Sequence, residues 1–541
     1  MFRDESSKVI QKAHAQWGVA DSPGSSSQAP QKQELMSTSL LPASSSSLGR
    51  ASISSGSSPA SRPSFSSYSP RSTICTEYDA ECPAQPTASS RTPYSSGFAK
   101  RQHGSSSMAL GPPRLPQPQP LWMPLTVGPT MEEQGVQFYT NHYLLGHPDE
   151  PPTMSEIKDL NSLFHPALQD VIAAVGLAGL SNLNGDSEMN DMSRRKYISA
   201  LNHTGKLITK APSAASPRDL DNILKTVVMM ALFEVVKGTH HSAHSVNAHI
   251  IGATNFMSTI VPKKHAPAGG VRGLIQLGYS LLIPCHASGT NVPDKVFKAI
   301  EFAMDHLPDH DQPVGNLGIL ATRYLQISSF VKRTVLTDGR PTAERTLQQL
   351  LALEEDFEAW EAALPPEWGY ELKHNSALPP TAVFQGKYHL YPDMWMARMW
   401  NHYRWSRILT NEMILDFVER FPETSISMVS ALQRWKCFDV NHRLSEDVMV
   451  STPSHWKHPH LDEKAKAGVS TNGQAGSGAV GVPALLHHLR VAGCTPGIST
   501  EAFEWTYRLV QSVWSDMGML HARIILDMMD KHKTKLVAAS S

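Results

Sequence analysis

The residues best suited to chemistry lie together in one segment, 391–413, with the sequence YPDMWMARMWNHYRWSRILTNEM. Placed on a helix, Arg404 and Arg407 lie about one turn apart, and His402 lies close to them. Two guanidinium groups at this spacing repel each other unless carboxylates, carbonyls or a bound anion face them. The segment therefore predicts either a hydrogen-bonded polar contact between helices or a site for a ligand carboxylate or phosphate.

The start of that helix is also predicted by its sequence. Pro392 and Asp393 precede the periodic residues, and an aspartate side chain at such a position caps the first backbone N–H groups of a helix. Two faces follow at steps of three and four residues. The apolar face holds Trp395, Met399, Tyr403, Leu409, Met413 and Phe417, and the polar face holds Asp393, Ala397, Asn401, Arg404, Arg407 and Asn411. A polar row of this length, if buried, requires hydrogen-bond partners.

Histidines supply the best candidates for metal binding. In HHSAH (240–244), His240 and His244 lie one helical turn apart, and a pair at this spacing, with His249 nearby, can bind zinc. The motif contains no glutamate to act as a base, so it differs from the H-E-x-x-H motif of metalloproteases. A histidine-rich turn between two helices is the interpretation that we favour. His521 lies on an apolar stripe and is expected to be a hydrogen-bonded core residue.

Two further patterns resemble enzyme sites but lack the surroundings of such sites. GSGAVG (476–481) matches the dinucleotide fingerprint G-x-G-x-x-G, yet no strand pattern precedes it and Pro483 follows, so a flexible loop is expected. The carboxylates at 354–358 offer an acid and base pair. They lie opposite an apolar stripe, which predicts a solvated acidic face instead. We therefore expect no catalytic residue, no cofactor and no metal ion.

Composition limits the class of protein. The 541 residues carry a formal net charge of −1, so no overall field attracts nucleic acid or an anionic membrane. The five cysteines are scattered, which suits a reducing compartment. The first residues contain no apolar signal segment, and no uncharged apolar run reaches the roughly 18 residues of a membrane span. We expect a soluble intracellular protein that binds no membrane.

A change in composition near residue 130 divides the chain. Residues 1–18 are predicted to be a short linker. Residues 19–150 are predicted to be disordered, because a segment rich in Ser, Pro and Gln cannot bury enough apolar surface to offset chain entropy. Residues 151–532 are predicted to form one helical domain with a flexible Gly-rich loop at 457–483, and residues 533–541 are expected to be a flexible tail.

Within the domain, apolar residues recur at helical spacing. Pro166 opens the segment 166–183, and 221–236 is apolar nearly all round, as in a helix buried among others. Segments 343–364 and 503–528 carry apolar stripes at steps of three and four residues. No sustained two-residue alternation is present. The fold class is therefore predicted to be all-α, a large multi-helix body of the bundle or solenoid type.

Blocks of this sequence, in order along the chain, resemble the fungal-specific transcription factor domain, which follows a binuclear zinc cluster in many fungal regulators. YHLYPDMWMARMWNHYRWSRILTNEMI (388–414) is similar to a signature of that family. The other similar blocks are HPALQDVIAAVGLAGLSN (165–182), RRKYISALN (194–202), LKTVVMMALFEVVKG (224–238), AHIIGATNFM (248–257), WEAALPPEWGY (360–370), VAGCTPGI (491–498) and DMGMLHARIILDMM (516–529). The resemblance extends from the start of the helical pattern almost to the end of the chain.

The resemblance implies an all-helical regulatory body in a nuclear protein that regulates transcription by RNA polymerase II. It also implies a DNA-binding cluster of two zinc ions held by six cysteines. Only Cys75 and Cys82 precede Cys285, and such a cluster needs its thiolates close together in sequence. We therefore expect a regulator of this family without its own zinc cluster, through truncation or loss, and we do not expect this chain to bind DNA directly.

Nuclear localisation, with shuttling to the cytoplasm, is expected from the resemblance. Two short basic clusters, 194–196 and 263–264, are candidates for part of an import signal, although clusters this small are usually surface charge. Neither cluster is interleaved with aromatic residues, as a nucleic-acid platform would be.

Three hypotheses on function follow. The first is a non-enzymatic regulator of a metabolic or secondary-metabolite pathway. Its partners would be other transcription regulators or co-regulators, a second copy of the chain, and a small-molecule effector in a cavity between helices. The second is a helical enzyme or ligand carrier that uses Arg404, Arg407 and His402. The third is a scaffold that oligomerises through the stripes at 350–364 and 503–528.

Overall fold

The structure, a computed structural model, describes residues 128–144, 165–214, 217–238, 242–260, 268–469 and 478–540. Of these residues 79% are helical and about 2% lie in strands, so the predicted all-α fold class is confirmed. The predicted linker at 1–18 and most of the segment predicted to be disordered lie outside the described residues. The α-helices are α2 (Met131–Tyr139), α3 (Pro166–Asn184), α4 (Ser187–Ala214), α5 (Pro217–Lys237), α6 (Ser242–Ile260), α7 (Ala268–Tyr279), α8 (Leu282–Ser288), α9 (Asp294–Met304), α10 (Gln312–Arg333), α11 (Pro341–Ala362), α12 (Met394–Arg420), α13 (Pro422–Ser425), α14 (Ala431–His455), α15 (Glu463–Gly468), α16 (Gly478–Cys494), α17 (Thr500–Met517) and α18 (Leu520–Ser540).

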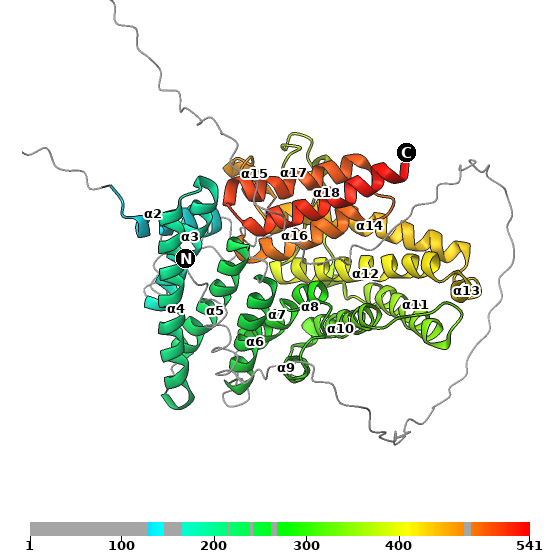
Figure 1. Ribbon diagram of the computed structural model, residues 1–541, viewed down its shortest axis with the longest axis horizontal. Helices are drawn as coiled ribbons and strands as arrows, with labels where there is room; N and C mark the ends of the chain where they lie inside the picture. The colour runs from blue at the N-terminus through cyan, green and yellow to red at the C-terminus, as the bar shows by residue number, and fades with distance from the viewer. Residues whose placement is uncertain are drawn as a thin grey trace, which may run out of the picture.

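Two groups of helices cross at a steep angle. In Figure 1, α4, α5 and α6 run upright on one side of the molecule, whereas α12, α16 and α18 run across it. The buried apolar residues form two main clusters, one around α12 and one between α3, α5 and the C-terminal helices. Val228 and Val246 pack against both clusters. The two groups of helices therefore share a continuous core.

α12 is the central helix of this arrangement. Most of its side chains between Met394 and Phe417 are buried, on all sides of the helix. It contacts α10 and α11 on one side and α14 and α16 on the other. The Asp393 carboxylate accepts a hydrogen bond from the backbone N–H of Met396 at 2.7 Å, so the predicted cap at the start of this helix is confirmed.

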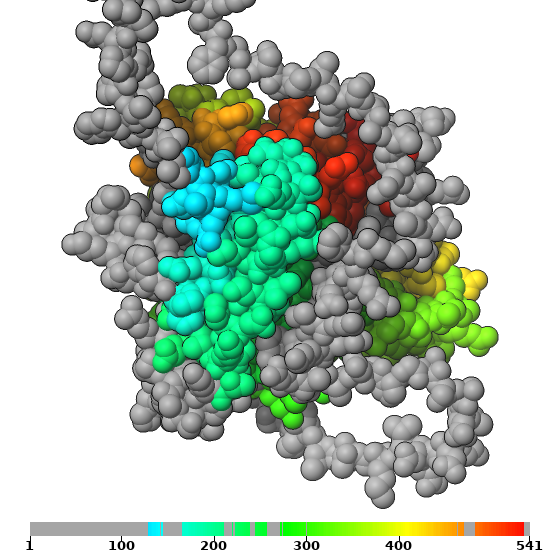
Figure 2. All heavy atoms as spheres, turned by 60° about the vertical axis from the view of Figure 1, so that its left-hand side comes forward, coloured from blue at the N-terminus to red at the C-terminus, as the bar shows by residue number. Residues whose placement is uncertain are grey.

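α2 and the π-helix that follows it, Thr140–Leu144, lie inside the segment predicted to be disordered, so that prediction is wrong for residues 131–144. In Figure 2 the blue-cyan atoms of this segment lie directly against the teal atoms of the next helices. A Cβ atom on Gly176 of α3 would lie only 1.8 Å from the carbonyl oxygen of Gly135 of α2. The two backbones therefore touch at a pair of glycines, and apolar content alone did not reveal this packing.

α3 begins at Pro166, as predicted, and it is the one helix within the described ranges that is long and apolar enough to cross a membrane. It packs against α2, α4 and α5, and 67% of its most apolar stretch is buried inside the protein. Burial of this kind is typical of the core helix of a multi-helix body.

Two short strands form a feature that the sequence did not predict. β1 (Glu371–His374) and β2 (Lys387–Leu390) pair antiparallel and are the only strands in the part of the chain that the structure describes. The hairpin precedes α12 directly and packs on α14. It places Tyr391 beside the first turns of α12, where its hydroxyl reaches Arg404. The hairpin therefore positions a hydrogen-bond partner for the polar face of α12.

The Gly-rich loop predicted at 457–483 is shorter in the structure. α15 begins after Asp462, whose carboxylate caps the helix by accepting a hydrogen bond from the N–H of Ala465 at 2.7 Å. α16 begins at Gly478, inside the glycine pattern itself. The tail predicted at 533–541 is also helical through almost all of its length, because α18 continues into it.

The apolar stripe at 503–528 is divided between two helices. α17 ends at Gly518, which has a φ of 62°, and α18 begins two residues later. A Cβ atom on Gly518 would lie 2.1 Å from the carbonyl oxygen of Gly179 in α3. The positive φ and the contact with α3 both require glycine, so the chain turns here although the apolar spacing continues.

Replacement of Gly176 by alanine is expected to lower the free energy of unfolding by about 1–3 kcal/mol, because the added methyl group overlaps the backbone of α2. Urea unfolding followed by circular dichroism measures this change. Gly205→Ala is the matched control, since Gly205 lies in α4 with no atom within 4 Å of its Cβ position. Alanine there should preserve stability or raise it by ~0.5–1 kcal/mol. Equal stability of both variants would contradict the packing of α2 on α3.

Candidate functional site

Arg407 of α12 is joined to α11 by several hydrogen bonds. Its Nη2 and Nε donate to Glu354 Oε1 at 2.6 and 2.9 Å, and its Nη1 donates to Glu361 Oε2 at 2.9 Å. Nη1 also donates to the Tyr403 hydroxyl, and Asn411 Nδ2 donates to Glu354 Oε2, both at 2.6 Å. Arg407 and Glu354 are each only 1% exposed. These five residues, the Arg407 network, connect α12 to α11 through the core.

The predicted solvated acidic face at 354–358 is wrong for Glu354. This side chain turns toward α12 because Arg407 is buried there, while the other carboxylates of the segment are exposed. Burial raises the pKa of Glu354 above its ordinary value, and the hydrogen bonds from Arg407 and Asn411 oppose that rise. The Glu354 carboxylate thus pairs with Arg407 and Asn411 in the core.

Glu361 extends the Arg407 network to α14. Arg443 donates from Nη1 and Nη2 to its two carboxylate oxygens at 2.8 and 2.9 Å, a bidentate geometry. Burial alone would raise the pKa of Glu361, but the hydrogen bonds from Arg443 and Tyr403 outweigh it and the pKa lies below the ordinary value. One carboxylate therefore serves an arginine of α12 and an arginine of α14.

Arg404 is fully buried on the same side of α12. Its Nη1 donates to the Tyr391 hydroxyl at 2.8 Å and to Asn401 Oδ1 at 2.9 Å, and its guanidinium lies 5.1 Å from the ring centre of Tyr370. The arginine row thus faces carboxylates, phenols and rings of this chain itself. The row is therefore a polar contact between helices. His402 lies on the opposite face of α12, where it lines a cavity, so Arg404, Arg407 and His402 do not come together as the alternative ligand site.

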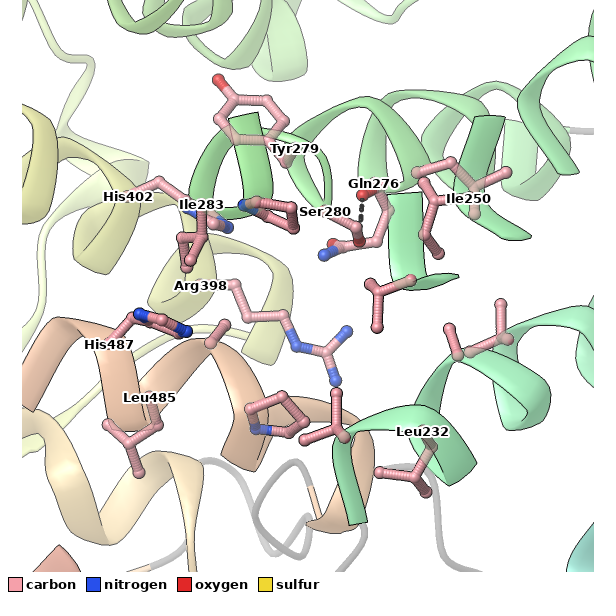
Figure 3. A pocket seen from close by; sticks show the side chains of 18 of the residues that line it. Leu232, Ile250, Gln276, Tyr279, Ser280, Ile283, Arg398, His402, Leu485 and His487 are labelled. Atoms are coloured by element: carbon pink, nitrogen blue, oxygen red, sulfur yellow. Dashed lines mark hydrogen bonds between the residues drawn. The ribbon is translucent and has the colours of Figure 1, made fainter. Parts of the chain in front are cut away.

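A cavity of about 330 Å³ lies on the opposite face of α12. Residues of α5, α6, α7 and α8 line one side of it, and residues of α12, α14, α16 and α18 line the other (Figure 3). The wall formed by α5 and α6 is apolar and contains Leu224, Val228, Leu232, Val235, Val246 and Ile250. The volume lies in the range of small-molecule sites in proteins.

Histidines gather at the other end of the cavity. The ring of His402 lies 4.9 Å from that of Tyr279 and 5.1 Å from that of His488. His487 and His521 share a hydrogen bond between their Nε2 atoms at 2.8 Å. Within the described residues, His402 Nδ1 and His488 Nε2 are buried without a hydrogen-bond partner. This end of the cavity therefore retains hydrogen-bonding capacity that the described part of the chain does not use.

Burial keeps the cavity histidines neutral at neutral pH. It lowers the pKa of His402 and of His455 to about 3, and the positive charge of Arg398 adds to both effects. It lowers the pKa of His521 to about 4. Neutral imidazole offers one N–H donor and one acceptor nitrogen, so these rings can serve as uncharged hydrogen-bonding groups.

Arg398 carries the only formal charge among the described residues that line the cavity. Figure 3 shows its side chain extending from α12 into the cavity, toward the side on which Leu232 lies. The sequence prediction missed this residue. Its signal was the spacing of Arg398 and His402, four residues apart on the face opposite the arginine row. The neighbouring pair His487 and His488, inside an apolar segment, was a second signal.

The predicted histidine cluster is not brought together by the described residues. His240 lies outside them, and His244 is exposed at the start of α6. His249 is buried, and its Nε2 lies at hydrogen-bond distance, 2.8 Å, from the Tyr197 hydroxyl. His521 is hydrogen-bonded, as predicted, although it lines the cavity as well.

The apolar stripes proposed to bind a partner chain are used inside the protein. In α11 the stripe at 350–364 packs into the core around α12, and in α17 and α18 the stripe at 503–528 faces α3, α5 and α16. The buried members are Leu350, Leu353, Phe357, Trp360, Phe503, Val510 and Met517. Oligomerisation through these side chains would require the helices that bury them to separate first.

An all-helical body with a cavity between its helices suits a regulatory or ligand-binding protein. Residues 151–279 match the family model described as the fungal specific transcription factor domain, so the resemblance is confirmed for the blocks between 165 and 257. The similar blocks from residue 360 onward lie outside the matched segment. The family indicates a role in transcription regulation and is generally non-enzymatic. Searches of curated proteins and of solved structures give no match.

Replacement of Glu354 by glutamine is expected to lower the free energy of unfolding by about 3–5 kcal/mol, because Arg407 then loses the main charge that neutralises it in the core. Urea unfolding provides the measurement. Glu355→Gln, at the exposed neighbouring position, is the control and should stay within ~0.5 kcal/mol of wild type. The double variant Glu354→Leu with Arg407→Met should recover much of the loss; a double variant as unstable as the sum of the single ones would contradict this account.

Stability is expected to fall as the pH drops below about 6.5. The pKa values of His402, His455 and His521 are lowered on folding, so between the folded and unfolded pKa values the unfolded chain binds more protons. Each histidine then removes up to about 1.4 kcal/mol per pH unit. Urea midpoints at pH 7.5, 6.5 and 5.5 measure the slope. His402→Gln should make it shallower, whereas replacement of the exposed His442 should not; equal slopes would contradict the assignment.

Proposed function

We propose that this chain is the effector-responsive regulatory module of a fungal transcription regulator that modulates transcription by RNA polymerase II in the nucleus. The observation that carries the proposal is the cavity. It joins α5, α6 and α7, which lie in the matched segment 151–279, to α12, α16 and α18 from the rest of the chain. A molecule that contacts both groups favours one arrangement of them over others. Ligand binding thereby changes the surface offered to partner proteins.

Contact with DNA is proposed to come through a partner, either another regulator or a co-regulator, with a second copy of the chain as a further candidate. The sequence holds five cysteines, one fewer than a binuclear zinc cluster of six requires. Cys285 and Cys437 are buried in the helical body. Burial raises the pKa of Cys285 to about 11 and that of Cys437 to about 12, so neither is a ready thiolate ligand. These features support recruitment rather than direct DNA binding. The regulated genes are proposed to be those of a metabolic or secondary-metabolite pathway.

Entry into the nucleus is proposed to depend on such a partner as well. Residues 263–264 lie outside the described residues. In the other basic cluster, 194–196, Lys196 is held by Glu132 and Asp170 at 2.6 and 3.1 Å, and the two arginines before it are exposed. Two exposed arginines supply little of the charge of an import signal.

The proposal is tested by tethering. The full chain is fused to a heterologous DNA-binding domain and expressed in a fungal strain that carries a reporter with the matching operator. We expect reporter transcript to rise or fall severalfold relative to the DNA-binding domain alone at equal protein level, because the module recruits its own partners. A transcript level unchanged by the fusion, with the fusion protein bound at the operator, would contradict the proposal.

A small-molecule-binding protein without a transcriptional role is the alternative, and the cavity itself favours it. Chromatin immunoprecipitation of the tagged chain separates the two functions. The regulator predicts enrichment at a limited set of promoters, reached through its partner, whereas the alternative predicts an even background across the genome.

A further inference from the structure

The groups that line the cavity select one class of ligand. We propose that the cavity binds an uncharged, mainly apolar alcohol, with the hydroxyl group at His402 and His488 and the hydrocarbon body along α5 and α6. The inference rests on the proposed function in that it names the class of the small-molecule effector. Its test is a binding measurement, so it stands or falls separately from the reporter experiment.

Several polar side chains of the cavity wall already have partners within the protein. The hydroxyls of Tyr279 and Ser280 each donate to a backbone carbonyl oxygen, at 2.6 and 2.9 Å. His487 and His521 share the hydrogen bond between their Nε2 atoms. Arg398 interacts with another group of the chain, and Figure 3 shows its guanidinium directed toward the apolar wall formed by α5. These side chains are therefore not assigned to the head group of the ligand.

His402 and His488 retain hydrogen-bonding capacity at the polar end of the cavity. Their ring centres lie 5.1 Å apart, and each side chain is 3% exposed. His402 Nδ1 and His488 Nε2 have no hydrogen-bond partner among the described residues. A buried polar atom without a partner costs free energy, and a ligand group that bonds to it removes this cost. The two histidines, from α12 and α16, therefore form the head-group site.

The chemistry of neutral imidazole favours a hydroxyl group there. Burial lowers the pKa of His402 to about 3 and holds the pKa of His488 well below its ordinary value, so neither ring is charged at neutral pH. An open ring nitrogen donates in one tautomer and accepts in the other. A hydroxyl group can do both, so it suits either tautomer. Gln276 Oε1, a further buried lining atom without a partner in the described part of the chain, accepts and so also favours an O–H group.

An ionised head group is disfavoured at this end of the cavity. Moving an ion out of water is costly unless an opposite charge meets it, and the two histidines carry no charge. Arg398, the one charged residue among the described lining residues, is directed toward the apolar wall and does not face the head-group site. An uncharged alcohol exchanges its hydrogen bonds with water for bonds to the rings and brings no charge into the cavity.

The apolar end of the cavity selects the body of the ligand. Four branched residues at steps of three and four form a stripe along one face of α5, namely Leu224, Val228, Leu232 and Val235. Ile250 of α6 also lines the cavity, and Figure 3 shows Leu232 and Ile250 on the side of the cavity away from His402. A stripe of branched apolar side chains favours a hydrocarbon body over a polar one.

Isothermal titration calorimetry with the purified full chain tests the head group directly. The probes are decanol, its methyl ether, decanoate and decylamine, which share an unbranched hydrocarbon chain and differ in the head group, each used below its solubility limit. We expect decanol to bind, the methyl ether to bind at least fivefold more weakly because it has no proton to donate, and the two ions to bind at least tenfold more weakly than decanol. Equal affinities of decanol and its ether, tighter binding of either ion, or no binding of decanol would overturn the proposal.

Substitution of the two histidines tests their assignment. The double variant His402→Phe with His488→Phe keeps both aromatic rings and removes their nitrogens. Its affinity for decanol is expected to fall at least fivefold, to that of the methyl ether. His442→Phe, at an exposed position of α14, is the control and should bind decanol like wild type. Unchanged decanol affinity in a folded double variant would overturn the proposal. If that variant fails to fold, the preference of the wild-type chain for decanol over its ether and the two ions decides the question.

Discussion

The buried ion pair between Arg407 and Glu354 is the constraint on which the rest of the structure depends. The Arg407 guanidinium is 1% exposed, and the carboxylate that pairs with it at 2.6 and 2.9 Å belongs to Glu354 of α11, 53 residues away in sequence. Glu361 adds a second carboxylate and passes the connection on to Arg443 of α14. Because each of these bonds has a fixed direction, α11, α12 and α14 can pack in only one relative rotation without leaving a charge unpaired.

The rotation of α12 in turn decides what faces the cavity. With Arg404 and Arg407 directed toward α11 and α14, helical geometry directs Arg398 and His402 to the opposite side, where α5, α7 and α16 meet. One helix thus has a face that fixes the fold and a face that can hold a ligand. The cavity depends on the ion pair, although no residue of the Arg407 network lines it.

Local features of this fold could be predicted from the sequence, because they depend on residues a few positions apart. The cap at Asp393 involves a backbone N–H only three residues later, and the helices α3, α5 and α11 follow from apolar spacing. The need for partners to the arginine row could also be predicted, because burying an unpaired charge is costly. The identity of the partner could not be predicted, because Glu354 belongs to an acidic run that resembles a solvated face.

The features that were missed depend on distant segments. α2 packs through the contact of Gly135 with Gly176, and glycines at a helix contact leave no apolar pattern in the sequence. The break between α17 and α18 at Gly518 is set by the backbone of α3. The cavity takes residues from eight helices, so the pattern around Arg398 alone carried only a weak signal. Long-range packing, rather than local propensity, decided each of these cases.

The central claim is that the Arg407 network organises the fold. Hydrogen exchange followed by mass spectrometry tests it most directly, because this method measures the free energy required to open each helix. If the Arg407 network organises the fold, the amides of α11, α12 and α14 exchange only through global unfolding and at a common free energy, while α4 and α6 exchange through smaller openings. Exchange of α12 as fast as that of α4, with α11 and α14 opening independently of it, would contradict this account.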